Sequence, residues 1–280
     1  MRFYRVYAEI TNVCALNCSF CPNKPQIARM MELPLFEKIA RELKGKCKEI
    51  ALHVMGDPLL NKNLRAYLDA AALFSHKISL TTSGFFLKLH DKSTLLHEAV
   101  GQINISLNSF NKNAKKLSLE KYLEPIFELI DYKLAKNGGE FINLRLWNLD
   151  AKNSEAVFNE AVFNAIYKKY GVKIDQNNNK IAKKTLVHFD ELFSWASLKS
   201  PVVEDTKCYG LNAQIAILAD GRVTPCCFDY EAKILLGDAN KESLEEILRR
   251  AAPMADALKN GIITEELCKR CSYRLRFKES

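Results

Sequence analysis

Strand-like runs alternate with stretches of helical period along the first 175 residues. The strand-like runs lie at Tyr4–Ile10, Ile50–Met55, Lys77–Thr82, Gln102–Leu107, Phe141–Trp147 and Val172–Asp175. Apolar residues recur at helical spacing between them, at about residues 33–45, 61–74, 91–99, 115–135 and 152–170. Strand–helix units in series predict a parallel sheet covered by helices. We therefore expect an α/β fold, a partial (β/α)6 barrel of the TIM type.

Two of the predicted strands alternate apolar with polar side chains, which places the two sets on opposite faces. The polar sets are Asn104, Ser106 and Asn108 in one strand and Asn143, Arg145 and Trp147 in the other. If the apolar sets face the helices, the polar sets line the barrel interior, which suits a ligand cavity. The alternative is that these strands lie at a solvated edge of the sheet.

The pattern changes after residue 175. Residues 176–187 are polar and aperiodic at first, which predicts a linker or long loop, and His188–Trp195 fits a short amphipathic helix. Asp220-Gly221 predicts a β-hairpin between the runs 214–219 and 222–224. Ser243 and Glu246 form a capping box that opens a helix over Leu244–Arg250.

We expect two domains, residues 1–200 and a small domain over residues 201–280 with a hairpin and short helices. The composition is globular, with 48% hydrophobic and 26% charged residues. No run approaches the ~20 apolar residues of a membrane span, and no signal peptide is visible, so we expect a cytoplasmic protein without membrane partners.

The formal net charge of +8 is weak evidence for a nucleic-acid partner, because Lys and Arg are spread along the chain. One group stands beside the last cysteines: Lys269, Arg270, Arg274, Arg276 and Lys278. These residues could balance the negative charge of a buried cluster or bind phosphate.

Nine cysteines in a reducing compartment indicate metal or redox chemistry rather than disulfides. Cys14, Cys18 and Cys21 form a C-x3-C-x-Φ-C arrangement with Phe20 at the aromatic position. They follow the first strand, at the end where barrel enzymes place their active sites. Three thiolates leave one iron of a four-iron cluster open, and an open position is where chemistry occurs.

Two further strand ends add polar groups to the same rim. The second strand ends in Met55-Gly56-Asp57-Pro58, which contributes a carboxylate, and the third ends in Thr82-Ser83-Gly84, a small polar turn able to hydrogen-bond a sugar. Taken alone, Phe20 could be a core aromatic residue and Asp57 a turn-forming Asp-Pro.

With these motifs the chain resembles radical S-adenosylmethionine (radical SAM) enzymes. The resemblance implies a 4Fe–4S cluster on Cys14, Cys18 and Cys21 whose open iron is chelated by SAM. An electron from the cluster then cleaves SAM to methionine and a 5′-deoxyadenosyl radical, which abstracts hydrogen from a substrate.

The same resemblance implies the SAM contacts. Phe20 would pack near the adenine, and Gly56-Asp57 stands at the family's Gly-Glu-Pro motif, whose backbone and acid receive the SAM ammonium. Aspartate has a shorter reach than the usual glutamate. Ser83, Ser106 and Arg145 fall where the family holds the ribose hydroxyls and the SAM carboxylate.

The C-terminal cysteines resemble the SPASM/twitch extension of these enzymes. Cys208 is followed by Gly221 and Cys226 in a C-x12-G-x4-C pattern, and a C-x2-C pair closes the set. The implied ligands of one auxiliary 4Fe–4S cluster are Cys208, Cys226, Cys268 and Cys271. Cys227 is the spare thiol, although its role could be exchanged with that of Cys226. By spacing alone, the alternative is a four-cysteine zinc site.

We thus expect an enzyme that abstracts hydrogen from a small-molecule or peptide substrate, in an oxidation, dehydrogenation or other modification. Its electron donor would be a protein such as flavodoxin or ferredoxin. The alternatives are an RNA-modifying radical SAM enzyme or, in another class, a zinc-stabilised binding protein. Candidates for substrate contact are His53, Asn108, Trp147, Asp190, Trp195 and Tyr209.

Overall fold

The computed structural model describes residues 2–22, 27–148, 155–204 and 206–277. The chain divides into two compact units. The first unit comprises Met1–Cys14, Cys21–Ile78 and Phe193–Ser280, and the second comprises Ala15–Phe20 and Ser79–Leu192. The predicted domain boundary at residue 200 stays a prediction.

Strands from both ends of the chain form the sheet of the first unit. They are β1 (Phe3–Ala8), β2 (Cys47–Ala51), β8 (Gln214–Ile217), β9 (Arg222–Thr224) and β10 (Gly237–Asp238), in the order β10-β9-β8-β1-β2. β1 runs parallel to both β2 and β8, and β8 and β9 form the predicted hairpin. Gly221 allows the tight turn with a φ of +90°.

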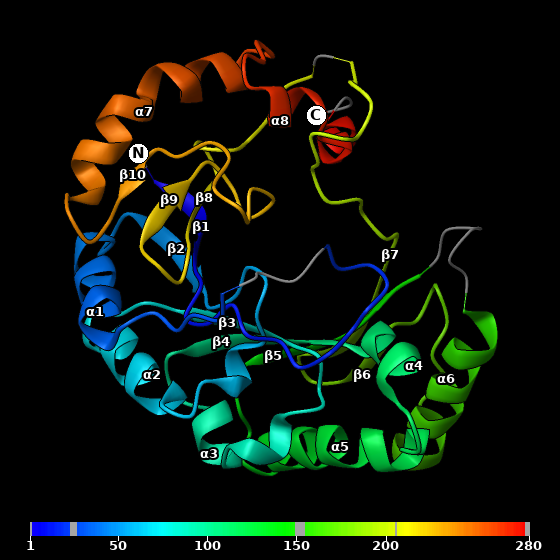
Figure 1. The fold of residues 1–280 in the computed structure, drawn as a ribbon. Coiled ribbons are helices and arrows are strands. Elements are labelled where there is room, and N and C mark those ends of the chain that lie inside the picture. Colours follow the sequence, from blue (N-terminus) through cyan, green and yellow to red (C-terminus); the bar gives the residue numbers. More distant parts are fainter. Residues whose placement is uncertain (1, 23–26, 149–154, 205, 278–280) are drawn as a thin grey trace. The chain divides into compact units, whose positions relative to one another are not determined.

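The helices of this unit include α1 (Leu33–Glu42), α2 (Leu64–Leu73), α7 (Leu244–Lys259) and α8 (Glu266–Lys269), with 3-10 turns at Pro58–Leu60 and Ser272–Phe277 (Figure 1). The predicted capping box of Ser243 and Glu246 is present at the start of α7. The helix continues beyond the predicted end at Arg250, because Ala251, Ala255 and Leu258 extend its buried stripe.

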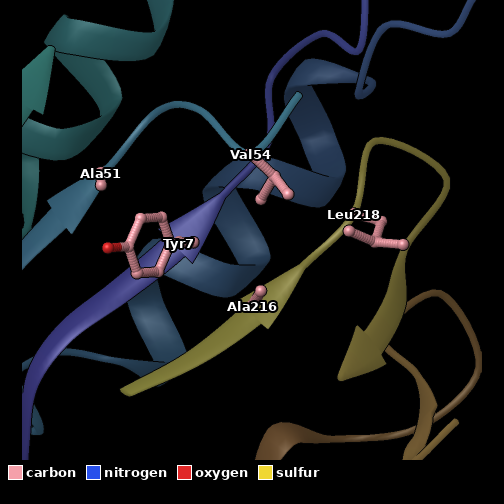
Figure 2. Packing of buried hydrophobic residues seen from close by; sticks show 5 residues of the cluster. All are labelled: Tyr7, Ala51, Val54, Ala216 and Leu218. Carbon is pink, nitrogen blue, oxygen red and sulfur yellow. The ribbon is translucent and has the colours of Figure 1, made fainter. Parts of the chain in front are cut away.

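A small apolar cluster joins three strands of the first unit. Figure 2 shows Tyr7 of β1, Ala51 and Val54 from β2 and its following loop, and Ala216 and Leu218 from β8 and its end. The cluster ties the C-terminal hairpin to the strand that leads into the first cysteine motif.

The second unit contains β3 (Ile78–Thr82) from Ser79 onward, together with β4 (Val100–Ser106), β5 (Phe141–Trp147), β6 (Lys180–Ala182) and β7 (Thr185–Asp190). β5 is parallel to β4 and β7, and β6 is antiparallel to β7. Its helices include α3 (Lys92–Leu95), α4 (Phe110–Asn113), α5 (Leu119–Ala135) and α6 (Ala156–Tyr170), with 3-10 turns at Leu87–Leu89 and Leu107–Ser109. Residues 152–154 of the helix predicted over residues 152–170 lie outside the described residues.

The apolar row of β4 faces the helices, as predicted. A Cβ on Gly84 would lie 3.0 Å from Ile105 of β4 and 3.3 Å from Ile126 of α5, so the three residues meet on one side. The polar row lies on the other face, where Asn104 Nδ2 donates to Ser79 Oγ at 3.3 Å and Asn143 donates to Asn104 at 3.1 Å.

Three predictions after residue 171 were wrong. One is the linker or long loop over residues 176–187, which contains β6 and the start of β7. Residues 172–175 are not a strand, because the Asp175 carboxylate accepts the backbone N–H groups of Asn177 and Asn178 and forms a turn. The last parallel strand of the second unit is β7, and the predicted helix over His188–Trp195 is not formed. The buried Lys133 of α5 stabilises the β6–β7 turn by donating to the carbonyl groups of Lys183 and Lys184.

The predicted fold class is confirmed, since parallel strands alternate with helices as in a partial barrel. In the described part of the chain, no helix has the length and apolar character needed to cross a membrane.

Candidate functional site

The first cysteine motif lies in a segment that leaves and returns at the carboxyl end of β1. Asn12 N–H donates to the Arg29 carbonyl at 3.1 Å, and Arg29 N–H donates to the Asn12 side chain at 2.7 Å. Met31 N–H donates to the Ile10 carbonyl at 3.0 Å. These bonds fix both ends of the segment that carries the cysteines.

Gly56 brings the loop after β2 against the same segment. A Cβ at this position would lie 2.1 Å from the Thr11 carbonyl oxygen, closer than any side chain allows. The next residue, Asp57, donates its N–H to the Val13 carbonyl at 3.0 Å, and its buried carboxylate accepts Leu59 N–H at 3.1 Å. The Gly56-Asp57 loop is therefore held directly beside the backbone that leads to Cys14.

Glu9 is a buried acid that the sequence analysis did not single out. Its two carboxylate oxygens accept Met55 N–H at 2.8 Å and Ala219 N–H at 3.1 Å. Burial raises the pKa of Glu9 to about 7. The only signal in the sequence is an acid between apolar residues of the first strand; its effect is to join the Gly56-Asp57 loop to the C-terminal hairpin.

In the second unit, α4 contacts the segment that contains Cys18. Asn113 Nδ2 donates to Cys18 Sγ at 3.3 Å, and Asn113 Oδ1 accepts Asn17 N–H at 2.8 Å. Phe20 is half-buried in the same unit, whereas Cys14 and Cys21 belong to the first unit. Asn113 thus supports the middle cysteine of the motif, and no local pattern in the sequence indicates this role.

Ser83, Ser106 and Arg145 all lie at or near strand ends of the second unit. The Ser83 carbonyl accepts the Tyr122 hydroxyl at 2.6 Å, which fixes the turn after β3. Ser106 of β4 is the register partner of Arg145 of β5, so their side chains share the polar face of the sheet.

Arg145 is part of an aromatic and polar cluster. Its guanidinium carbon lies 4.6 Å from the centre of the Trp147 ring. Trp147 Nε1 donates to His188 Nδ1 at 2.9 Å, and burial together with the charge of Arg145 lowers the pKa of His188. His188 was missed because the sequence analysis placed it in a helix, whereas it is the register partner of Arg145 in β7.

The four C-terminal cysteines of the predicted cluster lie near one another in the first unit. Cys271 is buried, and Cys208 Sγ accepts Gly210 N–H at 3.4 Å. Burial raises the pKa of Cys226 well above its ordinary value, and the charges of Cys208, Cys271 and Cys268 raise it further. Burial also raises the pKa of Cys268 to about 12.

An aromatic shell and one buried cation surround these thiols. Cys271 and Cys226 pack with Phe228, Phe193, Trp195 and Tyr273. Arg274 is 1% exposed, and its Nη2 atom has no hydrogen-bond partner among the described residues. The charge of Arg274 lowers the pKa of Cys208 and Cys271, opposing the effect of burial.

This donor set fits an iron–sulfur cluster. Within the described residues, no three His, Cys, Asp or Glu side chains are placed to hold a single metal ion. A four-iron cluster takes each thiolate on a different iron, so its ligands stand farther apart than those of one ion. Four neighbouring thiols and an unsatisfied cation suit such an anionic group.

The spare thiol, Cys227, packs on the aromatic cluster around Cys271, as Cys226 does, and on a second cluster as well. It packs against the Tyr7 cluster, and its sulfur lies 3.9 Å from Gln214 Oε1. Burial raises the pKa of Cys227 to about 11.

Two family models match the chain. Residues 8–143 match the radical SAM superfamily, and residues 208–272 match an iron–sulfur cluster-binding domain, the SPASM domain. No curated protein matches the chain.

Several solved structures share the fold at low sequence identity. BtrN in complex with AdoMet and 2-DOIA is 16% identical with a TM-score of 0.58, and the match covers 97% of this chain and 94% of BtrN. Native anSMEcpe with bound AdoMet is 14% identical with a TM-score of 0.62, and the match covers 98% of this chain and 88% of anSMEcpe. SuiB of Streptococcus suis bound to S-adenosylmethionine is 16% identical with a TM-score of 0.51, and the match covers 96% of this chain and 70% of SuiB.

The two matched ranges contain both cysteine motifs, and the cofactors that accompany these domains are SAM and two iron–sulfur clusters, as predicted. The chain therefore belongs to the radical SAM superfamily and carries a C-terminal iron–sulfur cluster-binding domain of the SPASM type.

Proposed function

We propose that this protein reductively cleaves SAM and uses the resulting radical to abstract hydrogen from an organic substrate. The net reaction would be an oxidation, a dehydrogenation or another modification of a small molecule or a peptide. The main support is the contact of Gly56 with Thr11, because it fixes the loop at the family's SAM-binding position against the backbone that leads to Cys14.

Each cluster has its own set of thiolates in this proposal. Cys14, Cys18 and Cys21 would hold the first cluster, and the ligands of the second would be Cys208, Cys226, Cys268 and Cys271. When bound, the first cluster supplies an open iron and an electron for SAM cleavage, and the second, with four thiolates, supplies a closed electron-transfer site.

The chain's other residues would bind and orient SAM. The backbone of Gly56-Asp57 is placed to receive the ammonium group, while Leu59 N–H occupies Asp57 Oδ1. The polar face that carries Ser106 and Arg145 would receive the ribose and the carboxylate. Ser83 would contribute at the ribose and Phe20 at the adenine.

The Arg145 side chain is well suited to bind a carboxylate. Its planar guanidinium lies over the Trp147 ring, which restricts its orientation, and a guanidinium can bind a carboxylate through two parallel N–H groups. Trp147 is restricted in turn by its hydrogen bond to His188. This arrangement lowers the entropy lost when SAM binds.

Structures with similar folds support both substrate classes. BtrN has been solved with 2-DOIA, SuiB with the precursor peptide SuiA, and anSMEcpe with the Cp18Cys peptide. We expect an electron donor such as flavodoxin or ferredoxin and a cytoplasmic location, where thiols stay reduced.

Anaerobic reconstitution with iron and sulfide tests the proposal. We expect roughly eight irons per chain, the visible absorption of iron–sulfur clusters, and 5′-deoxyadenosine formation that depends on both SAM and a reductant. A colourless protein that takes up zinc and does not cleave SAM would instead support a zinc-stabilised binding protein.

A further inference from the structure

The basic side chains beside the last cysteines differ sharply in their surroundings. Lys269 forms an ion pair with Glu266 at 2.8 Å, and Arg276 lies 5.2 Å from the centre of the Tyr273 ring. Arg270 donates to the Ser200 carbonyl at 2.7 Å. Arg274 is the fully buried one among those that the structure describes, with 1% of its surface exposed.

Arg274 is held in place by backbone groups on one side. Its Nε donates to the Cys268 carbonyl at 2.8 Å, and its Nη1 donates to the Thr206 carbonyl at 3.2 Å. Its own backbone N–H donates to the Cys271 carbonyl at 3.3 Å. The guanidinium is thus fixed beside the backbone of Cys268, and the Arg274 backbone is fixed beside that of Cys271.

The Nη2 atom is left with no hydrogen-bond partner among the described residues. A buried guanidinium without a counter-ion is costly. The described ion pairs give Arg274 no carboxylate, and the proposed ligands whose backbone it contacts are Cys268 and Cys271. An anionic group seated among these cysteines would satisfy both the charge and the unpaired donor.

We propose that Arg274 is a positioning and charge-compensating residue for the auxiliary cluster, donating from Nη2 to one of its sulfurs and raising its reduction potential. This inference rests on the ligand set given under the proposed function. A four-thiolate 4Fe–4S cluster is a dianion when oxidised and gains a further negative charge on reduction. A fixed positive charge nearby stabilises the reduced form more, and hydrogen bonds to cluster sulfurs act in the same direction.

The test isolates the auxiliary cluster by replacing Cys14, Cys18 and Cys21 together with alanine. In this background we would compare Arg274, Arg274→Lys and Arg274→Gln by iron analysis and by redox titration followed with electron paramagnetic resonance. We expect roughly four irons per chain. The potential should shift to more negative values in Arg274→Gln and by less in Arg274→Lys.

The matched control is Lys269→Gln, which removes the same charge from a half-buried side chain of the same segment that is paired with Glu266. We expect its potential to stay near that of the parent. An unchanged potential in Arg274→Lys, or a shift in Lys269→Gln equal to that of Arg274→Gln, would overturn the inference. If Arg274→Gln does not fold, the reduction potential of Arg274→Lys still tests the inference. Absence of iron in the background protein would instead overturn the ligand assignment.

Discussion

The side-chain amide of Asn113 donates a hydrogen bond to the sulfur of Cys18 over 3.3 Å. The same side chain accepts Asn17 N–H, so one residue of α4 fixes both the backbone and the thiol of the middle cysteine. Residues that hydrogen-bond to a metal ligand orient it and tune its basicity. Asn113 therefore connects the helical layer of the second unit to the proposed SAM cluster.

Replacing Asn113 with alanine should lower SAM cleavage by about 10- to 100-fold, the usual cost of losing such a support. The measurement is 5′-deoxyadenosine formation per reconstituted chain. Asn111→Ala is the control on the same helix, because Asn111 donates to Glu155 instead. Equal rates of 5′-deoxyadenosine formation in the two variants would show that Asn113 does not support the cluster.

Gly56→Ala should weaken SAM binding. The added Cβ would overlap the Thr11 carbonyl, so the loop must move away from the cysteine segment. We expect at least a tenfold rise in the Kd for SAM, measured by calorimetry on the reconstituted protein, which corresponds to about 1.4 kcal/mol. Gly139→Ala is the matched control, since a Cβ there meets nothing within 4 Å. An unchanged Kd for SAM in Gly56→Ala would show that this loop does not contribute to SAM binding.

Arg145→Lys should also raise the Kd for SAM, by about tenfold. Lysine keeps the charge but loses both the stacking on Trp147 and the bidentate donor geometry. Arg65→Lys, at a surface ion pair with Asp69, should leave the Kd unchanged. If Arg145→Lys instead left SAM binding intact and altered only the turnover of a substrate, Arg145 would belong to the substrate site.

Glu9 predicts a pH dependence of stability. Its pKa rises from 4.5 to about 7 on folding, mainly through burial, with Asp220 adding to the rise and Arg222 opposing it. Between these values the unfolded chain releases a proton that the folded chain keeps, so stability falls as the pH rises. From pH 5 to pH 8, the loss of stability attributable to Glu9 is about 2–3 kcal/mol.

Glu9→Gln removes this titration. The thermal midpoint of the parent protein should therefore fall relative to that of Glu9→Gln as the pH is raised from 5 to 8. Parallel midpoints across this range would show that Glu9 ionises in the folded protein as it does in the unfolded chain.

Local sequence patterns predicted the elements whose signal is local. β5 was predicted with its bounds, and Asp220-Gly221 predicted the hairpin, because alternation and turn chemistry are short-range properties. The last parallel strand of the second unit was predicted at the wrong place. Residues 172–175 alternate like a strand, but the Asp175 side chain closes a turn there. For the same reason His188, which lies in β7, was not predicted as a site residue.

Residues whose roles depend on tertiary contacts could not be found in this way. Asn113 lies 95 positions from Cys18, and nothing near either residue signals their contact. The sequence showed that Arg274 is one of several cations near the last cysteines, but burial distinguishes it from the others. The C-terminal cysteine group, in contrast, was predicted because its C-x12-G-x4-C and C-x2-C patterns resemble those of the SPASM/twitch extension.

The division of roles between the two cysteine groups can be tested most directly with Cys18→Ala and Cys271→Ala. Each variant is reconstituted anaerobically, its iron is counted, and 5′-deoxyadenosine is measured with excess SAM and reductant. We predict that Cys18→Ala abolishes SAM cleavage while keeping the auxiliary cluster, and that Cys271→Ala still cleaves SAM. Cleavage that survives in Cys18→Ala and is lost in Cys271→Ala would contradict the assignment.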